Sequence, residues 1–398
     1  MINKIIVPAF LGIMSILSLG AMGQDQRNQY PPLLSDSYFG VNIGYINYPF
    51  SNAHMEPGFR AGSVHVPHTA VRIILFGHHI TKYLSAQITY MRPVNWVYYS
   101  DVNGDKKNHS VFMNIGGLTL KSQVPFYRNK FSAFGEAGLA VITRSGFKIN
   151  GTDAVKDANY ASIITAAGIQ YHLNSKWDFI VHGAWSPPHA KAKQPSTLFL
   201  SGGFHLNMRP LPAKAVEKKI KAGFIFPRNL VQAGFVTNEF GYGVNKFVSE
   251  GAIPFFWGGQ IKVKKGVAIH YEHNIFHARK VFSLDWGASF GYYKTQSSSF
   301  YTLSAFPVLR FTLLRTKTTD FYMYYSVAGP AIISRNIIDG TDTGKKFTFQ
   351  DLMGIGIFTG KKRNINGEIR IGHYSNGNIF PNNPGVMIPL TFNIGYAF

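Results

Sequence analysis

The pattern that most constrains the fold of this chain is an alternation of apolar and polar residues without any long apolar run. Beyond residue 23, no stretch approaches the ~18 consecutive apolar residues of a membrane helix. Apolar, polar and aromatic residues instead alternate in segments of about ten, bounded by turn residues. Phe (33), Tyr (21) and Gly (40) are abundant, whereas charged residues make up only 15%. This pattern is typical of a β-barrel in the outer membrane of a Gram-negative bacterium.

The first residues have the features of a secretory signal peptide. A basic start containing Lys4 is followed by the apolar run Ile5–Leu19 and by Ala21-Met22-Gly23, a small-x-small cleavage site. We expect cleavage between Gly23 and Gln24, so that residues 1–23 are the signal peptide. The alternative, an N-terminal membrane anchor, is disfavoured because the apolar run is short for a spanning helix.

The formal charge of +21 would suggest a nucleic-acid partner in a cytosolic protein. The export signal argues against such a partner, and the anionic phosphates of outer-membrane glycolipids are the better counter-charge. Much of the positive charge is also placed in turns, for example Lys361-Lys362-Arg363. Cysteine is absent, which excludes disulfides and thiolate metal sites.

Eight alternating segments precede residue 209. Long and short connections alternate between them: Pro49 to His68 separates the first two, whereas only Ile80-Thr81 separates the second and third. This alternation predicts an up-and-down barrel with short periplasmic turns and longer outer loops. The predicted strands are Tyr38–Tyr48, Thr69–His79, Lys82–Arg92, Lys107–Leu120, Phe131–Thr143, Asn159–Leu173, Lys176–Trp185 and Ser196–Met208.

Arg209 to Lys221 breaks the alternation with two prolines and five Lys or Arg residues, which predicts a periplasmic linker. Residues Ala222 to Gly251 have no clear pattern. Eight further strands follow: Ile253–Val263, Gly266–Phe276, Lys280–Lys294, Phe300–Leu314, Asp320–Ile333, Lys345–Thr359, Asn366–Ser375 and Met387–Phe398.

The predicted fold is therefore all-β, with two tandem antiparallel up-and-down transmembrane barrels of about eight strands each. The first barrel is expected within residues 24–208, the linker within 209–221 and the second barrel within 222–398. The alternative is a single barrel of about sixteen strands that acts as a porin. A linker rich in Pro and Lys argues against it, because one continuous sheet needs no such break.

The last predicted strand carries an apolar stripe and ends on an aromatic residue, Phe398, as the signal for barrel assembly does. We expect this stripe to face lipid. Its residues are Ile388, Leu390, Phe392, Ile394 and Tyr396.

The preceding strand places a base and a hydroxyl on one face. His373 and Ser375 are two residues apart, and side chains two apart on a strand point the same way. Ile369 and Ile371 continue this face, so in a membrane barrel His373 and Ser375 end a stripe that faces lipid. Glu368 belongs to the opposite face, which is the lumen.

Residues Glu239 to Phe398 resemble the outer-membrane lipid A 3-O-deacylase family, the PagL-type enzymes. The resemblance rests on Phe347–Asp351 in one strand, on His373–Asn376 near the outer loop and on the closing strand. The resemblance implies hydrolysis of an ester-linked acyl chain from the lipid A of lipopolysaccharide. The position of this ester in the family is 3-O. The first half resembles a generic small outer-membrane barrel.

The residue types fit ester hydrolysis, which needs a nucleophile, a base and donors for the oxyanion. Ser375 is the expected nucleophile and His373 the expected base. The Asn376 side chain, or the backbone amides of Asn376 and Gly377, are the expected oxyanion donors. The alternative is a catalytically silent structural or adhesive barrel, in which His373 and Ser375 are only interfacial polar residues.

The chain departs from the family at the acidic member of the triad. The family glutamate lies fourteen residues after the histidine, and this position is Met387. Asp351 shares the outward face on the neighbouring strand, where an unpaired carboxylate is costly, so we expect it to have a partner. The orienting group is either Asp351 or a loop asparagine, namely Asn378, Asn382 or Asn383.

We expect neither a cofactor nor a metal. His270, His273 and His277 lie close in sequence, but His270 is on the opposite face of its strand from the other two. The expected partners are lipid A and the outer membrane, without nucleic acid. The sequence does not fix the oligomeric state and is compatible with a homodimer.

Overall fold

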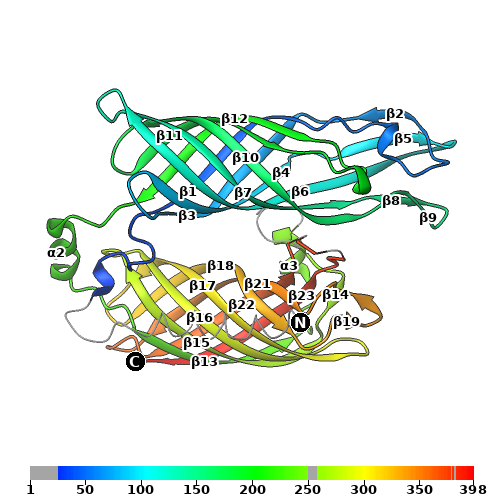
Figure 1. Ribbon diagram of the computed structural model, residues 1–398. Helices are drawn as coiled ribbons and strands as arrows, with labels where there is room; N and C mark the ends of the chain where they lie inside the picture. The colour runs from blue at the N-terminus through cyan, green and yellow to red at the C-terminus, as the bar shows by residue number, and fades with distance from the viewer. Residues whose placement is uncertain (1–25, 250–257, 378, 381) are drawn as a thin grey trace.

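The computed structural model describes residues 26–249, 258–377, 379–380 and 382–398, in which nearly all regular structure is antiparallel β-sheet. The strands close into two separate barrels that lie side by side (Figure 1). Within the described residues, no helix is long and apolar enough to cross a membrane. The predicted signal peptide, residues 1–23, lies outside the described residues.

The first barrel has eight strands and is closed by the pairing of β1 with β12, from Ser37 opposite Met208 to Asn47 opposite Leu198. All eight predicted strands of this half are confirmed, with shifts of a few residues at their ends. The strands are β1 (Ser37–Asn47), β3 (Thr69–His79), β4 (Leu84–Pro93), β6 (Asp105–Phe126), β7 (Phe131–Ser145), β10 (Ala158–His172), β11 (Trp177–Ser186) and β12 (Thr197–Met208).

The outer end of the first barrel extends beyond that of the second (Figure 1). Strand β6 is 22 residues long, and its outer part pairs with β5 (Val97–Val102), which in turn pairs with β2 (Ala61–His65). A hairpin of β8 (Phe147–Ile149) and β9 (Thr152–Val155) lies beside it. Sequence analysis assigned none of these short strands, because each is shorter than the segments of about ten residues that identify barrel strands.

The second barrel also has eight strands and is closed by the pairing of β13 with β23. Two closed barrels confirm the predicted fold and exclude the single wide barrel. The strands are β13 (Asn229–Thr237), β15 (Lys265–His277), β16 (Phe282–Lys294), β17 (Ser299–Arg315), β18 (Thr319–Ile333), β21 (Phe347–Thr359), β22 (Ile365–Ser375) and β23 (Val386–Ala397).

One predicted strand of the second barrel is wrong. Ile253–Val263 was expected to open the barrel, but residues 253–257 lie outside the described residues and only Ile261–Lys262 forms a strand, β14. Strand β14 pairs in parallel with the outer end of β23. The opening strand is β13, in the stretch that had no clear pattern. Between β13 and β14 the chain leaves the sheet and forms the short helix α3 (Gly243–Phe247).

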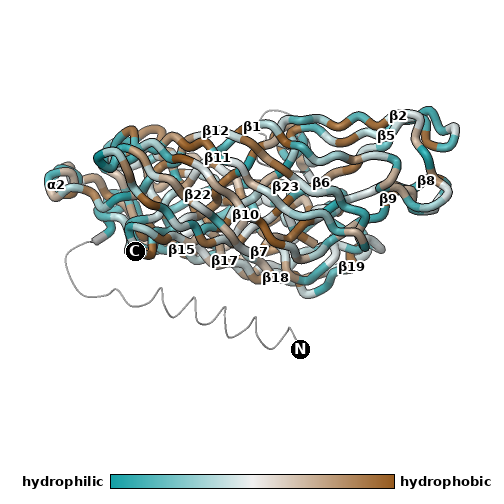
Figure 2. The backbone as a smooth tube through the Cα atoms, turned by 45° about the horizontal axis from the view of Figure 1, so that its top comes forward, coloured by the Kyte–Doolittle hydropathy of each residue, from teal (hydrophilic) through white to brown (hydrophobic). Residues whose placement is uncertain are grey.

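Hydrophobic and hydrophilic residues alternate along the strands (Figure 2), and in the second barrel the exposed large residues of the strands are mostly apolar, as expected for a surface that faces lipid. Ile355 and Ile394 are 62% and 76% exposed on the outside. Ile388 was expected to share this stripe but lies in an apolar cluster within the barrel. A bulge between β22 and β23, between the pairs Arg370/Thr391 and Gly372/Ile388, reverses the facing of the residues beyond it.

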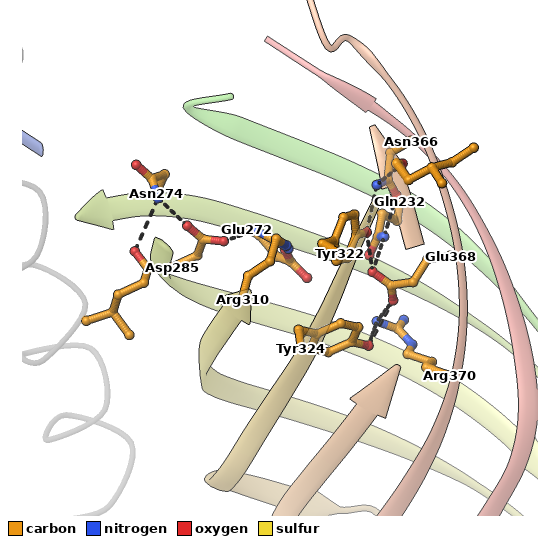
Figure 3. Close-up of polar contacts among 12 residues, drawn as sticks. Gln232, Glu272, Asn274, Asp285, Arg310, Tyr322, Tyr324, Asn366, Glu368 and Arg370 are labelled. Atoms are coloured by element: carbon orange, nitrogen blue, oxygen red, sulfur yellow. Dashed lines mark hydrogen bonds and ion pairs between the residues drawn. The ribbon is translucent and has the colours of Figure 1, made fainter. Parts of the chain in front are cut away.

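A network of charged and polar side chains lies in the interior of the second barrel, beside its buried apolar clusters (Figure 3). The Tyr322 and Tyr324 hydroxyls each donate to Glu368 at 2.8 Å, and Arg370 pairs with the same carboxylate at 3.3 Å. Glu368 therefore faces the lumen, as predicted. Arg310 pairs with two further carboxylates, Glu272 and Asp285. An eight-stranded barrel is just wide enough for side chains to fill.

Contacts at both ends link the two barrels. At the periplasmic end, the predicted linker contains the helix α2 (Ala213–Lys221), from which the Lys219 ammonium donates to the carbonyl of Asn28 at 3.0 Å. Arg27 donates to the carbonyl of Phe226, also at 3.0 Å. At the outer end, the Asn159 amide donates to the carbonyl of Ile379 at 2.5 Å. The N-terminal segment of the first barrel is thus packed on the second.

Candidate active site

The pairing of β21 with β22 brings Asp351 and His373 together. The two residues are direct cross-strand partners, and Asp351 Oδ2 lies 3.2 Å from His373 Nδ1. The same register pairs Ile355 with Ile369, both exposed on the barrel exterior, without a bulge in between. Asp351 and His373 therefore lie on the outward face, as sequence parity predicted. The pairing also shows that Asp351 and His373 lie at the same depth along the barrel, which the sequence alone could not show.

The second oxygen of Asp351 is held by a bulge in the neighbouring strand. The backbone amide of Ala328 donates to Asp351 Oδ1 at 2.7 Å. Ala328 has a φ of +51° and lies where the register of β18 shifts between Ser326 and Gly329. The bulge turns this amide away from the sheet ladder and toward the carboxylate. Asp351 thus has two partners, as its placement on an apolar face requires.

Ser375 is the last residue of β22 and lies on the same face as His373. It is partly buried and lies opposite Phe349, whereas His373 and Asp351 are only 1% and 5% exposed. Of the three candidate side chains, the hydroxyl is therefore the most accessible from outside. Tyr374, between His373 and Ser375, points inward and donates to Thr302 Oγ1 at 3.0 Å.

His373 does not contact lipid directly, contrary to expectation. A Cβ added at Gly385, whose φ is +68°, would lie 3.1 Å from His373 Nε2 and 3.0 Å from the carbonyl oxygen of Gly258. The loop before β23 therefore approaches the imidazole closely at Gly385, and Gly258, just before β14, lies against the same glycine. Val248, just after α3, covers the neighbouring Ile371 from outside. Val248 thus lies on the outward face beside the site.

Met387 lies where the family pattern places a glutamate. It is the partner of His373 on β23 and is almost fully buried, so the position adjoins the imidazole as the pattern requires. No carboxylate is present there. Among the described residues, the carboxylate of Asp351 contacts His373 from the strand on the other side, β21. Neither Asp351 nor His373 interrupts the antiparallel ladder.

Asn376 organises the loop after β22. Its side-chain amide donates to the carbonyls of Asn382 at 3.1 Å and Thr343 at 3.5 Å, and its backbone amide donates to the Asn383 side chain at 2.8 Å. The donors of Asn376 are thus used within the loop. Gly377, with a φ of +62°, carries the next backbone amide along the chain. Asn382 binds Asp342 rather than His373, and Asn378 lies outside the described residues.

Sequence reasoning did not identify Ala328 and Gly385 as parts of this site. A bulge leaves no regular sequence signal, and Ala328 is an ordinary residue for a strand. Pro384-Gly385 marks a turn, but its approach to His373 depends on the folded loop. Across the residues that the structure describes, no group of three or more His, Asp or Glu side chains could hold a metal ion.

The fold and the outward-facing site define the chain as a bacterial outer-membrane protein built from two tandem β-barrels. Residues 265–396 match the model of a family described as Lipid A 3-O-deacylase (PagL). The matched residues all lie in the second barrel, which confirms the resemblance seen in the sequence. The match covers strands β15 to β23 and includes Asp351, His373, Ser375 and Met387.

Several solved structures are similar to part of the chain. The outer membrane enzyme PagL is 15% identical and aligns over 43% of this chain and 98% of its own, with a TM-score of 0.29. Neisserial surface protein A is 10% identical over 43% and 97%, with a TM-score of 0.30. The N-terminal barrel domain of OprF from Pseudomonas aeruginosa is 13% identical over 44% and 98%, with a TM-score of 0.26. No curated protein matches the chain in sequence.

Proposed function

We propose that the second barrel removes an ester-linked acyl chain, at the 3-O position, from the lipid A of lipopolysaccharide. The observation that carries this proposal is the contact of Asp351 with His373 Nδ1 on the outward face, with Ser375 two residues further along the same face. The family match supports the substrate and the acyl position. Without the Asp351 contact, the missing family glutamate would argue for an inactive barrel.

The proposed reaction proceeds by nucleophilic catalysis in two steps. Ser375 Oγ attacks the acyl carbonyl carbon while His373 Nε2 accepts the hydroxyl proton. The bond from the carbonyl carbon to the sugar oxygen then breaks, and His373 returns the proton to that oxygen. Water attacks the acyl-serine with the same base, which releases the fatty acid and restores Ser375.

Asp351 is the proposed orienting group. A carboxylate at Nδ1 accepts a hydrogen bond from the Nδ1–H group, which leaves the basic lone pair on Nε2 and stabilises the imidazolium once it forms. The Ala328 amide fixes the carboxylate for this task. Asp351 on β21 thus replaces, from the opposite side of His373, the glutamate that the family places at Met387.

The proposed oxyanion donor is the backbone amide of Gly377. The donors of Asn376 are bound to Asn382, Thr343 and Asn383, so Asn376 supports the reaction by holding the loop in place. A positive φ at Gly377 turns its peptide group away from the line of the strand. An oxyanion donor of this kind lowers the activation free energy by about 3–4 kcal/mol in measured cases.

Mass spectrometry of lipid A tests the proposal in cells. Gram-negative cells that express this protein should contain lipid A lacking one ester-linked acyl chain, whereas cells without it should retain the full set. Expression of Ser375→Ala at the same level in the outer membrane serves as the control. Unchanged lipid A in cells with the folded wild-type protein would favour the catalytically silent barrel.

A further inference from the structure

Four lysines gather at the outer end of the second barrel, on β14, β15 and β16 and in the short connection between β14 and β15. We call them the lysine patch: Lys262, Lys264, Lys265 and Lys294. All four are exposed. Ile261 and Val263 belong to the apolar cluster inside the barrel, so the intervening Lys262 faces outward. Lys265 is in step with the exposed Val267 and Ile269, which places it on the outward face as well.

The lysine patch concentrates positive charge, and among the described residues none of its lysines forms an ion pair with a carboxylate. Lys265 and Lys294 are direct cross-strand partners, an arrangement that is destabilising for like charges. Within the described part of the chain, the side-chain contacts of the patch are with Gln296 and with the rings of Tyr242 and Tyr292. By contrast, Lys156 and Lys193 of the first barrel both pair with Glu56.

The position of the patch relates it to the candidate site. Lys262 is the partner of Met387 on β23, and Met387 is the partner of His373 on β22. Partners across strands share a face, so Lys262 and His373 lie at the same level, two strands or about 10 Å apart. Directly toward the membrane from the patch, the same outward face is apolar, with Val267, Ile269 and Phe290 all exposed.

Positive charge at the headgroup level above an apolar face fits an amphiphile with an anionic head and several acyl chains. We infer that the lysine patch binds a phosphate group of a glycolipid in the outer leaflet. The inference deepens the proposed function, on which it rests for the identity of the lipid. A phosphate bound at Lys262 places the adjoining sugar and its acyl esters beside Ser375. The patch therefore selects phosphorylated lipid A and sets which ester reaches the nucleophile.

The test separates binding from hydrolysis by using the full-length Ser375→Ala protein in detergent micelles. The measurement is its affinity for labelled bisphosphorylated lipid A and for the same lipid after enzymatic removal of the phosphates. In this background the four lysines of the patch are changed to glutamine together. A second variant reverses the charge at only two positions of the patch, with Lys262→Glu and Lys264→Glu. The control changes Lys361→Gln and Lys362→Gln in an exposed periplasmic turn, with heat-modifiable gel migration as the check on folding.

We expect the patch variants to lose about tenfold or more in affinity for the phosphorylated lipid, the sum of four exposed ionic contacts. Affinity for the dephosphorylated lipid and for both lipids in the control should stay the same. High salt should weaken binding by the parent and not by the patch variants. Competition by millimolar inorganic phosphate would support the inference, because it would show that the patch binds the phosphate group itself.

Two results would overturn the inference. An equal loss for both lipids would mean that the lysines support the loop, and unchanged affinity for the phosphorylated lipid would mean that they are merely solvated. Neither result depends on hydrolysis, which is measured separately with Ser375 intact. A patch that binds phosphorylated lipid in a protein without deacylase activity would leave this inference standing and remove the proposed reaction.

Discussion

At the residue scale, the site depends on which atoms strand pairing brings together. The sequence places His373, Ser375 and Asp351 on one face through parity alone. Parity does not fix depth, so only the register, with Asp351 opposite His373, shows that the carboxylate can replace the missing glutamate. The buried state of His373 could not be predicted, because it depends on how the loop that contains Gly385 folds against the imidazole.

Asp351→Asn should reduce deacylation by about 10³–10⁴-fold, as loss of the aspartate does in serine hydrolase triads. The amide oxygen can still accept from the Ala328 amide, so the bulge and the fold should remain. The amide nitrogen would face Nδ1 as a donor and would favour the wrong tautomer of His373. Release of fatty acid from lipid A by the purified variant measures the effect. A small loss in a folded variant would point to a Ser–His dyad or to a loop asparagine.

At the element scale, alternation predicts long strands well and short excursions poorly. Seven barrel strands of the second half, β15 to β18 and β21 to β23, were found because each spans at least ten residues with period two. The opening strand β13 was missed because it is short and lies between Pro227 and a stretch without pattern. Ile253–Val263 was predicted as a strand because alternation resumes at Ile253, but its described part forms only β14. Residues that hold loops in place through hydrogen bonds are likewise not predicted by the alternation of apolar and polar residues.

Asp339 is such a residue, because it ties the hairpin of β19 (Ile337–Ile338) and β20 (Thr341–Asp342) to the turn between β16 and β17. Its carboxylate accepts from the Thr295 hydroxyl at 2.7 Å and from the Ser297 amide at 3.0 Å. Partial burial raises the pKa of Asp339, but these hydrogen bonds outweigh it and hold the pKa well below the ordinary 3.8. The stabilisation is therefore present above about pH 4 and is lost as the pH falls below that value.

Asp339→Asn should loosen this hairpin at neutral pH. Trypsin should then cleave the folded variant faster at Arg335 and Lys345, while cleavage at Lys361 in a periplasmic turn stays unchanged as the internal control. In the wild type, cleavage of the same hairpin by pepsin should increase as the pH is lowered from 4 to 2. Equal cleavage rates for wild type and variant would show that Asp339 does not hold the loop.

At the scale of the whole molecule, two complete barrels share one chain but contact each other mainly through their ends. Each barrel closes on its own strands, through β1 with β12 and through β13 with β23. The contacts of Arg27 with Phe226 and of Asn159 with Ile379 set their relative position. The sequence predicted the two barrels from strand counts and the linker, but not these contacts, which join residues far apart in the chain.

Separate expression of residues 24–208 and 222–398 should give two barrels that each fold in detergent. The physical reason is that every strand of each barrel has both of its neighbours within the same half. Heat-modifiable gel migration of each half, compared with the whole chain, measures this. If the halves fail to fold while the whole chain succeeds, the end contacts are required for folding and the boundary at 209–221 does not divide independent domains.

The central claim is that Ser375 is the nucleophile of a lipid A deacylase, and the most direct test compares purified wild type with Ser375→Ala. The loss of one hydroxyl at a partly exposed strand end should leave the barrel folded, as heat-modifiable migration can verify. We predict that the wild type releases fatty acid from lipid A and that Ser375→Ala releases none above background. His373→Ala should lose nearly as much, because a base and its nucleophile act as one unit. Full activity in Ser375→Ala would contradict the account.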